Sequence, residues 1–142
     1  MNAQTPVIAP AEEALGAGAP VERSNILIVD DRLDKRVVFR TVLEELDQNI
    51  VTASSGEEAL RWLLDNDCAV ILLDVNMPGM DGLSLTRRIK QDSSTPVVLI
   101  TAADRRSVEA RLKGSAVDSV LFKPFRVDEL MAVVNKALSA IT

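Results

Sequence analysis

Five polar side chains come directly after short apolar runs in the sequence: Asp30, Asp31, Asp74, Thr101 and Lys123. If the three carboxylates meet, they repel each other by about 1–4 kcal/mol per pair at about 4 Å, so the group needs a proton or a cation. Oxygen ligands without His or Cys favour a hard cation, so Mg²⁺ fits better than Zn²⁺. Mg²⁺ bound by carboxylates keeps a coordination position for a phosphate oxygen, and a lysine and a hydroxyl can donate hydrogen bonds to further phosphate oxygens. Together these residue types predict a magnesium-dependent phosphate site.

Each of the five residues also has a simpler interpretation. Asp30 and Asp31 can cap the next helix, Thr101 can do the same, Asp74 can belong to a turn, and Lys123 can be a surface charge. The joint pattern favours a site, because all five residues fall at the ends of apolar runs.

Composition narrows the chemistry further. The chain has 142 residues, a formal net charge of −5, no His, no Tyr and one Cys. Without His, a histidine base, a Ser-His-Asp triad and most zinc sites are excluded, and Cys68 alone makes no internal disulfide. The acidic balance argues against a nucleic-acid surface, since phosphate binding relies on clustered Lys and Arg.

The first 24 residues differ from the rest of the chain. They hold three of the six Pro and show no apolar periodicity, so we predict a flexible Ala/Pro-rich extension over 1–24 and one domain over 25–142. The first basic residue is Arg23, which argues against a signal peptide, and no apolar run approaches the roughly 20 residues of a membrane span. We therefore expect a cytoplasmic protein without membrane contact.

The apolar runs alternate with stretches of helical periodicity. The pattern predicts five helices, one beginning after Ser55 and the others over 34–46, 83–91, 105–113 and 127–140. It predicts five strands, over 26–29, 50–53, 69–73, 96–100 and 119–122. Continuous apolar strands that alternate with helices indicate an α/β fold with a parallel, doubly wound sheet covered on both faces. Ligands bind such sheets at the carboxyl ends of the strands, where the five polar residues fall.

The motifs around these residues resemble the receiver domain of bacterial response regulators. The resemblance covers residues 25 to about 140 and rests on four motifs in order, namely Asp30-Asp31, the stretch LLDVNMPGMDG at 72–82, Thr101-Ala102-Ala103 and Lys123-Pro124-Phe125. It implies a flavodoxin-like sheet with strand order 2-1-3-4-5, and a Lys123–Pro124 peptide that is often cis in the family.

The resemblance also implies a role for each residue. Asp74 would accept a phosphoryl group from the phosphohistidine of a sensor histidine kinase or phosphotransfer protein. Asp31 would bind Mg²⁺ directly and Asp30 mainly through water, with further ligands from Asp74 and the backbone carbonyl of Asn76. Thr101 and Lys123 would contact the phosphoryl oxygens.

In this interpretation the chain is a switch within a two-component system or phosphorelay, not a turnover enzyme. It would act on a downstream protein, and a homodimer is possible.

One position departs from the receiver pattern. Receivers commonly carry Tyr or Phe three residues before the lysine, and here that residue is Val120. The alternative is therefore a constitutive interaction module with a receiver fold that phosphorylation does not regulate. An aspartyl phosphatase is disfavoured because Asn76 stands where an acid–base carboxylate is needed. A flavin site is disfavoured because no Gly-, Ser- or Thr-rich loop follows the first strand.

Overall fold

The computed structural model describes residues 23–74, 82–114 and 117–139. Its five strands form one parallel sheet in the order β2-β1-β3-β4-β5. The sequence-based fold class and the strand order implied by the resemblance are both confirmed. The strands are β1 (Asn25–Val29), β2 (Asn49–Ala53), β3 (Val70–Asp74), β4 (Val97–Thr101) and β5 (Ser119–Phe122).

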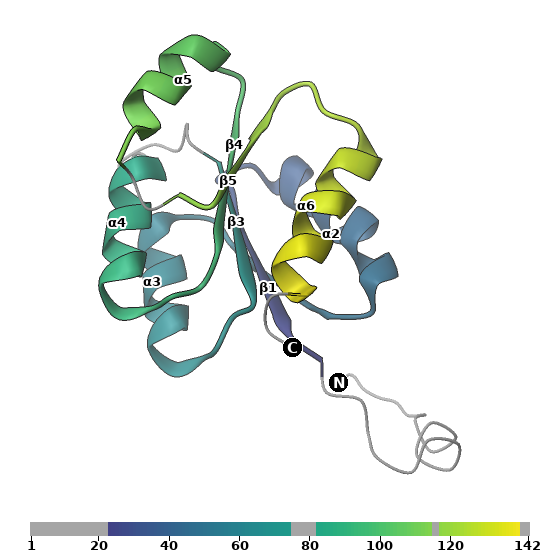
Figure 1. Ribbon diagram of the computed structural model, residues 1–142. Coiled ribbons are helices and arrows are strands. Elements are labelled where there is room, and N and C mark those ends of the chain that lie inside the picture. The colour runs from purple at the N-terminus through teal and green to yellow at the C-terminus, as the bar shows by residue number, and fades with distance from the viewer. Residues whose placement is uncertain (1–22, 75–81, 115–116, 140–142) are drawn as a thin grey trace, which may run out of the picture.

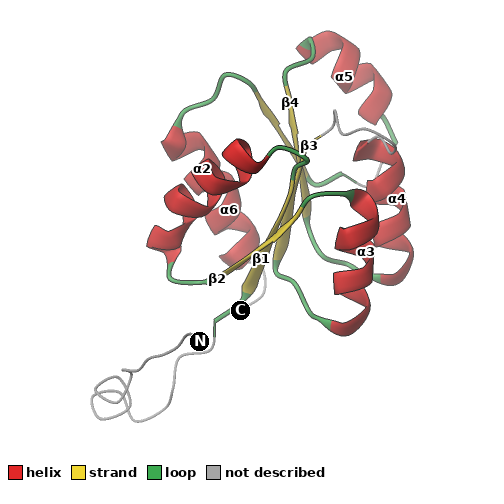
Figure 2. Cartoon of the chain, turned by 180° about the vertical axis from the view of Figure 1, so that it is seen from behind, coloured by secondary structure: helices red, strands yellow, loops and turns green. Residues whose placement is uncertain are grey.

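Helices cover both faces of the sheet. Figures 1 and 2 show how the helices are divided between the two faces. The first face carries α2 (Leu33–Leu43) and α6 (Val127–Ser139). The second face carries α3 (Gly56–Asp65), α4 (Gly82–Asp92) and α5 (Arg105–Leu112).

Alternation along the strands divides the core into two layers. In β1, Ile26 and Ile28 pack with residues of α2 and α6, whereas Leu27 and Val29 pack with residues of α3 and α4. Burying such a side chain contributes about 1.5–3 kcal/mol. Because strands such as β1 are apolar on both faces, the sheet is held rigidly, and the residues at its carboxyl edge are held with it.

Two details differ from the sequence-based expectations. The helix expected over 34–46 ends at Leu43 and continues as a short 3₁₀ helix, η1 (Glu44–Leu46), which stops at Asp47 in the left-handed conformation, with φ 56°. Thr101 does not cap the next helix, because the Asp104 side chain accepts the hydrogen bond from the Ser107 N–H at α5. The predicted N-cap Ser55 is confirmed, since its hydroxyl accepts a hydrogen bond from Glu58 N–H.

The ends of the chain add little to this picture. Most of the predicted extension, residues 1–22, lies outside the described residues. None of the helices in the described ranges has the length and apolar content that a membrane crossing requires.

Candidate functional site

The strand register brings the predicted residues together at the carboxyl-terminal ends of the strands, which form the carboxyl edge of the sheet. In the pairing of β1 with β3, Val29 lies opposite Leu73, so Asp30 and Asp74 follow at neighbouring positions. In the pairing of β4 with β5, Thr101 lies opposite Phe122, and the Lys123 N–H donates to the Thr101 carbonyl at 2.7 Å. The ends of β1, β3, β4 and β5 therefore meet, as expected for parallel strands.

Three carboxylates form the centre of this edge. Asp30, Asp31 and Asp74 each place a carboxylate oxygen within 4.8 Å of the others. Asp30 is 2% exposed and Asp74 is 5% exposed, whereas Asp31 faces solvent. Burial raises the pKa of Asp30, and the Asp74 carboxylate adds to that rise. The cluster thus holds buried negative charge that a cation would stabilise.

The loop after β1 is fixed by its own hydrogen bonds. The Arg32 N–H donates to Asp30 Oδ1 at 3.0 Å, and Arg36 Nη1 donates to the Asp30 carbonyl at 2.7 Å. On the other side, the Asp30 N–H donates to the Ala53 carbonyl. Asp30 is therefore held on its backbone and its side chain, and α2 begins in a fixed relation to the carboxylates.

Lys123 reaches into the carboxylate cluster from the end of β5. Its Nζ lies 3.9 Å from Asp74 Oδ2. Burial lowers the pKa of Lys123, and the neighbouring Lys35 lowers it further, while Asp74 opposes both effects. The Lys123–Pro124 peptide is cis, as the resemblance implied.

Thr101 ends β4 beside this group and is 1% exposed. Its hydroxyl oxygen accepts a hydrogen bond from the Ala103 N–H at 3.0 Å. Because that bond uses an acceptor lone pair, the hydroxyl hydrogen is available to donate to an anion.

Sequence reasoning missed two cationic side chains of α2. Arg36 holds the Asp30 carbonyl, and Lys35 contacts Lys123 near Asp30 and Asp74. Apolar periodicity does not find such residues, because they lie on the polar side of the helix. The available signal was their position in the first turn after Asp30-Asp31.

The site offers ligands suited to a hard divalent cation. The carboxylates of Asp30, Asp31 and Asp74 supply oxygen atoms only, which is the donor set that Mg²⁺ prefers. Asn76, the fourth expected ligand, lies outside the described residues. The described part of the site fits the ion.

The aromatic residues near Lys123 have different surroundings. Phe125 packs in the core and stacks on Phe39 with ring centroids 6.2 Å apart, whereas Phe122 lies under the Arg105 guanidinium at 4.2 Å. Val120 is half-buried against the α3–α5 layer of the core. The side chain at position 120 is therefore a packed aliphatic group.

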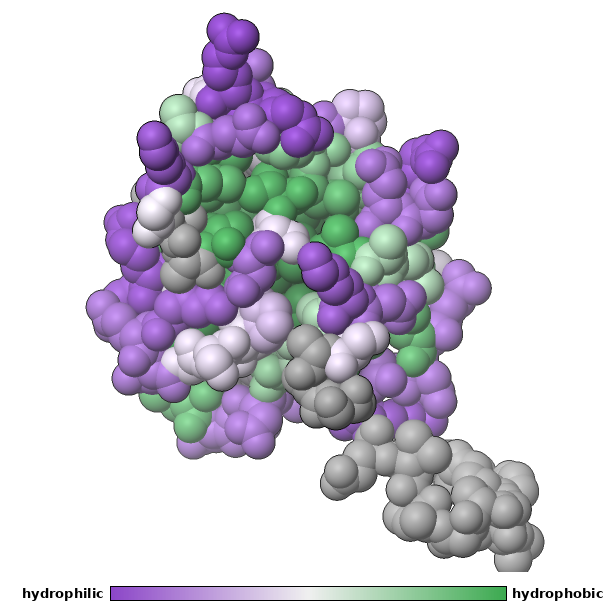
Figure 3. Space-filling view, viewed as in Figure 1, coloured by the Kyte–Doolittle hydropathy of each residue, from purple (hydrophilic) through white to green (hydrophobic). Residues whose placement is uncertain are grey.

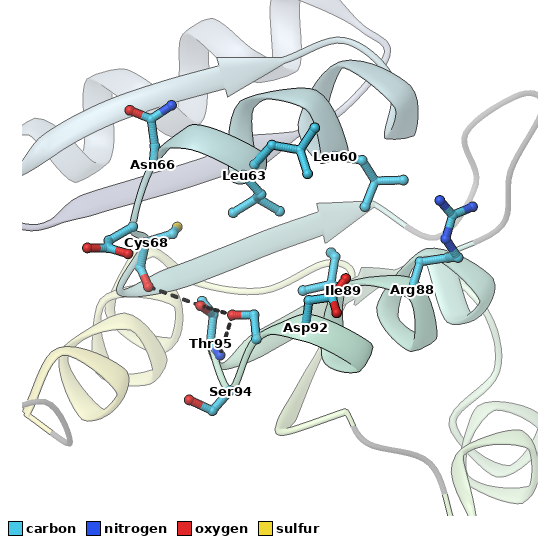
Figure 4. A pocket seen from close by; sticks show the side chains of 12 residues that line it. Leu60, Leu63, Asn66, Cys68, Arg88, Ile89, Asp92, Ser94 and Thr95 are labelled. Atoms are coloured by element: carbon cyan, nitrogen blue, oxygen red, sulfur yellow. Dashed lines mark hydrogen bonds between the residues drawn. The ribbon is translucent and has the colours of Figure 1, made fainter.

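A hollow of about 490 Å³ lies between α3 and α4, at the amino-terminal ends of the strands, which form the amino edge of the sheet (Figure 4). Leu60, Leu63 and Ile89 line it, with Cys68 and Thr95 near the strand ends. The Thr95 hydroxyl donates to the Cys68 carbonyl at 3.2 Å, and the Cys68 thiol donates to the Val70 carbonyl. Burial raises the pKa of Cys68 to about 11. The hollow thus presents an un-ionised thiol.

Sequence comparison finds relatives over most of the chain. The pattern that describes the response regulator receiver domain matches residues 26–135. The heme response regulator HssR of Staphylococcus haemolyticus is 36% identical over 112 residues, which are 79% of this chain and 50% of that protein. The transcriptional regulatory protein ResD of Bacillus subtilis is 32% identical over 81% of this chain and 48% of its own length. The chain spans about half the length of these curated relatives.

Structural comparison agrees. The receiver domain of the Francisella response regulator 1452 has a TM-score of 0.78 and 32% identity, covering 84% of this chain and all of that domain. The response regulator TrrA of Thermotoga maritima, in complex with Mg²⁺ and BeF, has a TM-score of 0.72 and 33% identity, covering 81% of this chain and 99% of that one. Those proteins and this chain share the fold.

Proposed function

Because this chain belongs to the response regulator receiver family, whose members are phosphoacceptor signalling modules rather than turnover enzymes, we propose that Asp74 accepts a phosphoryl group. The donor is a phosphohistidine of a sensor histidine kinase or phosphotransfer protein, and the reaction depends on Mg²⁺. The observation that carries the proposal is the buried Asp74 carboxylate between two other carboxylates and the Lys123 ammonium.

The proposed transfer is a displacement at phosphorus. One Asp74 carboxylate oxygen forms a bond to phosphorus while the phosphorus–nitrogen bond of the donor breaks, and its electron pair returns to the donor imidazole. The chain has no His and needs none, because the imidazole belongs to the donor.

The surrounding residues position the group and neutralise its charge, which is most of what phosphoryl transfer requires. Lys123 donates to one phosphoryl oxygen and the Thr101 hydroxyl to another. Asp30, Asp31 and Asp74, with the Asn76 carbonyl, would hold Mg²⁺. When bound, that ion neutralises charge on the transferring group.

The donor protein needs a surface to contact beside the site. Leu33 and Val37 at the start of α2 and Val127 at the start of α6 are exposed apolar side chains, and both helices begin at the carboxyl edge of the sheet. We assign the donor contact to these residues, within a receiver domain spanning 25–142 and preceded by the extension over 1–24.

The response to phosphorylation would appear on another face. In Figure 3, apolar side chains gather between α5 and α6, over the edge strand β5. Thr101 at the end of β4 is paired with β5, so a shift of its hydroxyl toward the phosphoryl group would reach this surface and change protein contacts there.

The second candidate is a constitutive module, and the packed Val120 is the observation that favours it. Titration with beryllofluoride and Mg²⁺ separates the two. A switch shows amide shift changes in α5 and β5, whereas a constitutive module shows none there.

The proposal is tested with acetyl phosphate as the donor. We expect the wild type to gain one phosphoryl group by intact mass only when Mg²⁺ is present, and Asp74→Asn to gain none. Asp67→Asn is the matched control, because Asp67 is an exposed carboxylate at the opposite edge of the sheet. Equal phosphorylation of the wild type and Asp74→Asn would refute the assignment.

A further inference from the structure

The hollow between α3 and α4 presents apolar side chains at the surface of the protein. Leu60 and Leu63 of α3 line one side and are only half-buried, and Ile89 of α4 lines the other (Figure 4). The volume of about 490 Å³ lies in the range of about 300–1,000 Å³ that is typical of ligand clefts. A segment that filled the hollow would remove these side chains from water, which is favourable in proportion to the apolar area covered.

The described chain starts beside this hollow. The Asn25 side-chain amide donates to the Asp67 carbonyl at 2.8 Å, and the Cys68 thiol lies 3.5 Å from the Asn25 carbonyl oxygen. Asp67 and Cys68 both line the hollow. Arg23, two residues before Asn25, forms an ion pair with Asp47 at 3.0 Å. The residues before Arg23 are therefore attached at the amino edge of the sheet, near the lining of the hollow.

One stretch of the N-terminal extension matches the hollow in polarity. Residues 6–10 have the sequence Pro-Val-Ile-Ala-Pro, and no charged side chain occurs within 1–11. Proline has no N–H, so the two prolines bring no backbone donor that would lose its hydrogen bond to water on burial. They also fix φ near −65°, so fewer conformations are lost when the segment is ordered. Residues 6–10 are therefore suited to an apolar surface.

Charge and chain length favour the same stretch. Two aspartates and one arginine give the lining of the hollow a net charge of −1, namely Asp67, Asp92 and Arg88. This charge opposes entry of the two glutamates at 12–13, whereas residues 6–10 carry no charge that it could repel. Residues 8–22 span up to about 50 Å when extended, which exceeds the roughly 30 Å diameter of a small domain. The segment can therefore reach the hollow from the start of the described chain.

We propose that residues 6–10 dock in the hollow between α3 and α4, with Val7 and Ile8 against the leucines of α3 and against Ile89. The docked segment joins the two helices at the amino edge and covers Cys68, which lines the hollow. The docking is independent of the proposed phosphorylation, because it concerns the opposite ends of the strands.

A spin label tests where the extension lies. A nitroxide is attached to Gln4→Cys in the full chain, with Cys68→Ser so that one thiol is present. We expect the amide signals of Leu60, Leu63 and Ile89 to be lost through paramagnetic broadening. Adding Ile8→Asp should restore the signals, because burying a carboxylate without a partner is unfavourable.

Ala17→Asp is the matched control. It adds the same charge to the extension outside residues 6–10, so the signals should stay lost. Signals that remain in the spin-labelled parent overturn the inference, and so does broadening that persists with Ile8→Asp. A mixture of spin-labelled chains with ¹⁵N-labelled chains that carry no nitroxide should show no broadening. Broadening in that mixture would place the extension of a second copy in the hollow and would also overturn the inference.

The native sequence allows a second measurement, because docked residues 6–10 shield the Cys68 thiol. We expect iodoacetamide to alkylate Cys68 about tenfold faster in Ile8→Asp than in the wild type, as for a segment that is docked about 90% of the time. Ala17→Asp should react like the wild type. Equal rates in all three proteins would contradict the docking.

Discussion

The two edges of the sheet carry very different groups. At the carboxyl edge, Asp30 and Asp74 are buried and lie close to each other and to Lys123. At the amino edge, a hollow is lined by Leu60, Leu63 and Ile89, and the Thr95 hydroxyl and the Cys68 thiol there donate to backbone carbonyls. Both edges belong to the same five strands, so the fold alone does not explain the difference.

Buried charged groups that lie close together indicate a reactive site better than the volume of a hollow does. The amino edge offers volume, and its thiol stays protonated at neutral pH because burial raises the pKa of Cys68 to about 11. The carboxyl edge holds carboxylates whose mutual repulsion lowers the stability of the protein until a cation binds among them. Because buried like charges lower the stability of the fold, their presence here indicates a role in binding or reaction.

The largest effect is expected at the carboxyl edge. Lys123→Met removes the ammonium beside Asp74 and should slow phosphorylation by acetyl phosphate by about 100–1,000-fold, as for the loss of one charge-stabilising donor. The rate of phosphoprotein formation at saturating Mg²⁺ measures this. Lys136→Met, on the exposed side of α6, should react like the wild type. If Lys123→Met slowed phosphorylation by less than about threefold, the phosphoryl group would not be bound beside Lys123.

At the amino edge we expect a stability effect without a chemical one. Ile89 is 3% exposed, so Ile89→Ala should lower the free energy of unfolding by about 3 kcal/mol through a cavity. Urea denaturation measures it, and the folded protein should still be phosphorylated at the wild-type rate. Leu64→Ala lines the same hollow but is 81% exposed, so its effect should stay below about 0.5 kcal/mol. If Ile89→Ala slowed phosphorylation, the amino edge would also affect the reaction, and the proposed difference between the two edges would be wrong.

The smallest effect concerns Cys68. Its pKa is raised to about 11 from 9.0, so at pH 8 its thiolate fraction is about 100-fold below that of an unperturbed thiol. The thiolate form, and with it the rate of alkylation by iodoacetamide, increases as pH rises toward 11. We expect native protein to react slowly at pH 8, and urea-unfolded protein to react at the ordinary rate. Fast alkylation of the native protein would show an accessible, ionised thiol at the amino edge.

Much of the fold could be predicted from local patterns. The apolar runs located all five strands. The signal is strongest for β1, β3 and β4, which are buried on both faces. The end of α2 was misjudged, since Leu46 continues the apolar spacing although Asp47 takes a left-handed conformation. The order of the strands came from the resemblance, because pairing between distant segments leaves no local signal.

The site was predictable where the backbone positions its residues. Asp30, Asp74, Thr101 and Lys123 lie at strand ends, so their place follows from parallel pairing alone. Lys35 was not found, because a long side chain on the polar side of a helix reaches the site only through the packing of α2 beside the carboxyl edge. The position of the Lys35 side chain near the site therefore depends on tertiary structure.

In the proposed reaction Asp74, and no other carboxylate of the cluster, carries the phosphoryl group. Borohydride reduces an acyl phosphate to the alcohol, so phosphorylated Asp74 becomes homoserine, which peptide mass spectrometry locates. After treatment with acetyl phosphate and Mg²⁺, we expect homoserine at position 74 alone and none when Mg²⁺ is withheld. Homoserine at position 30 or 31, or none at any position, would contradict it.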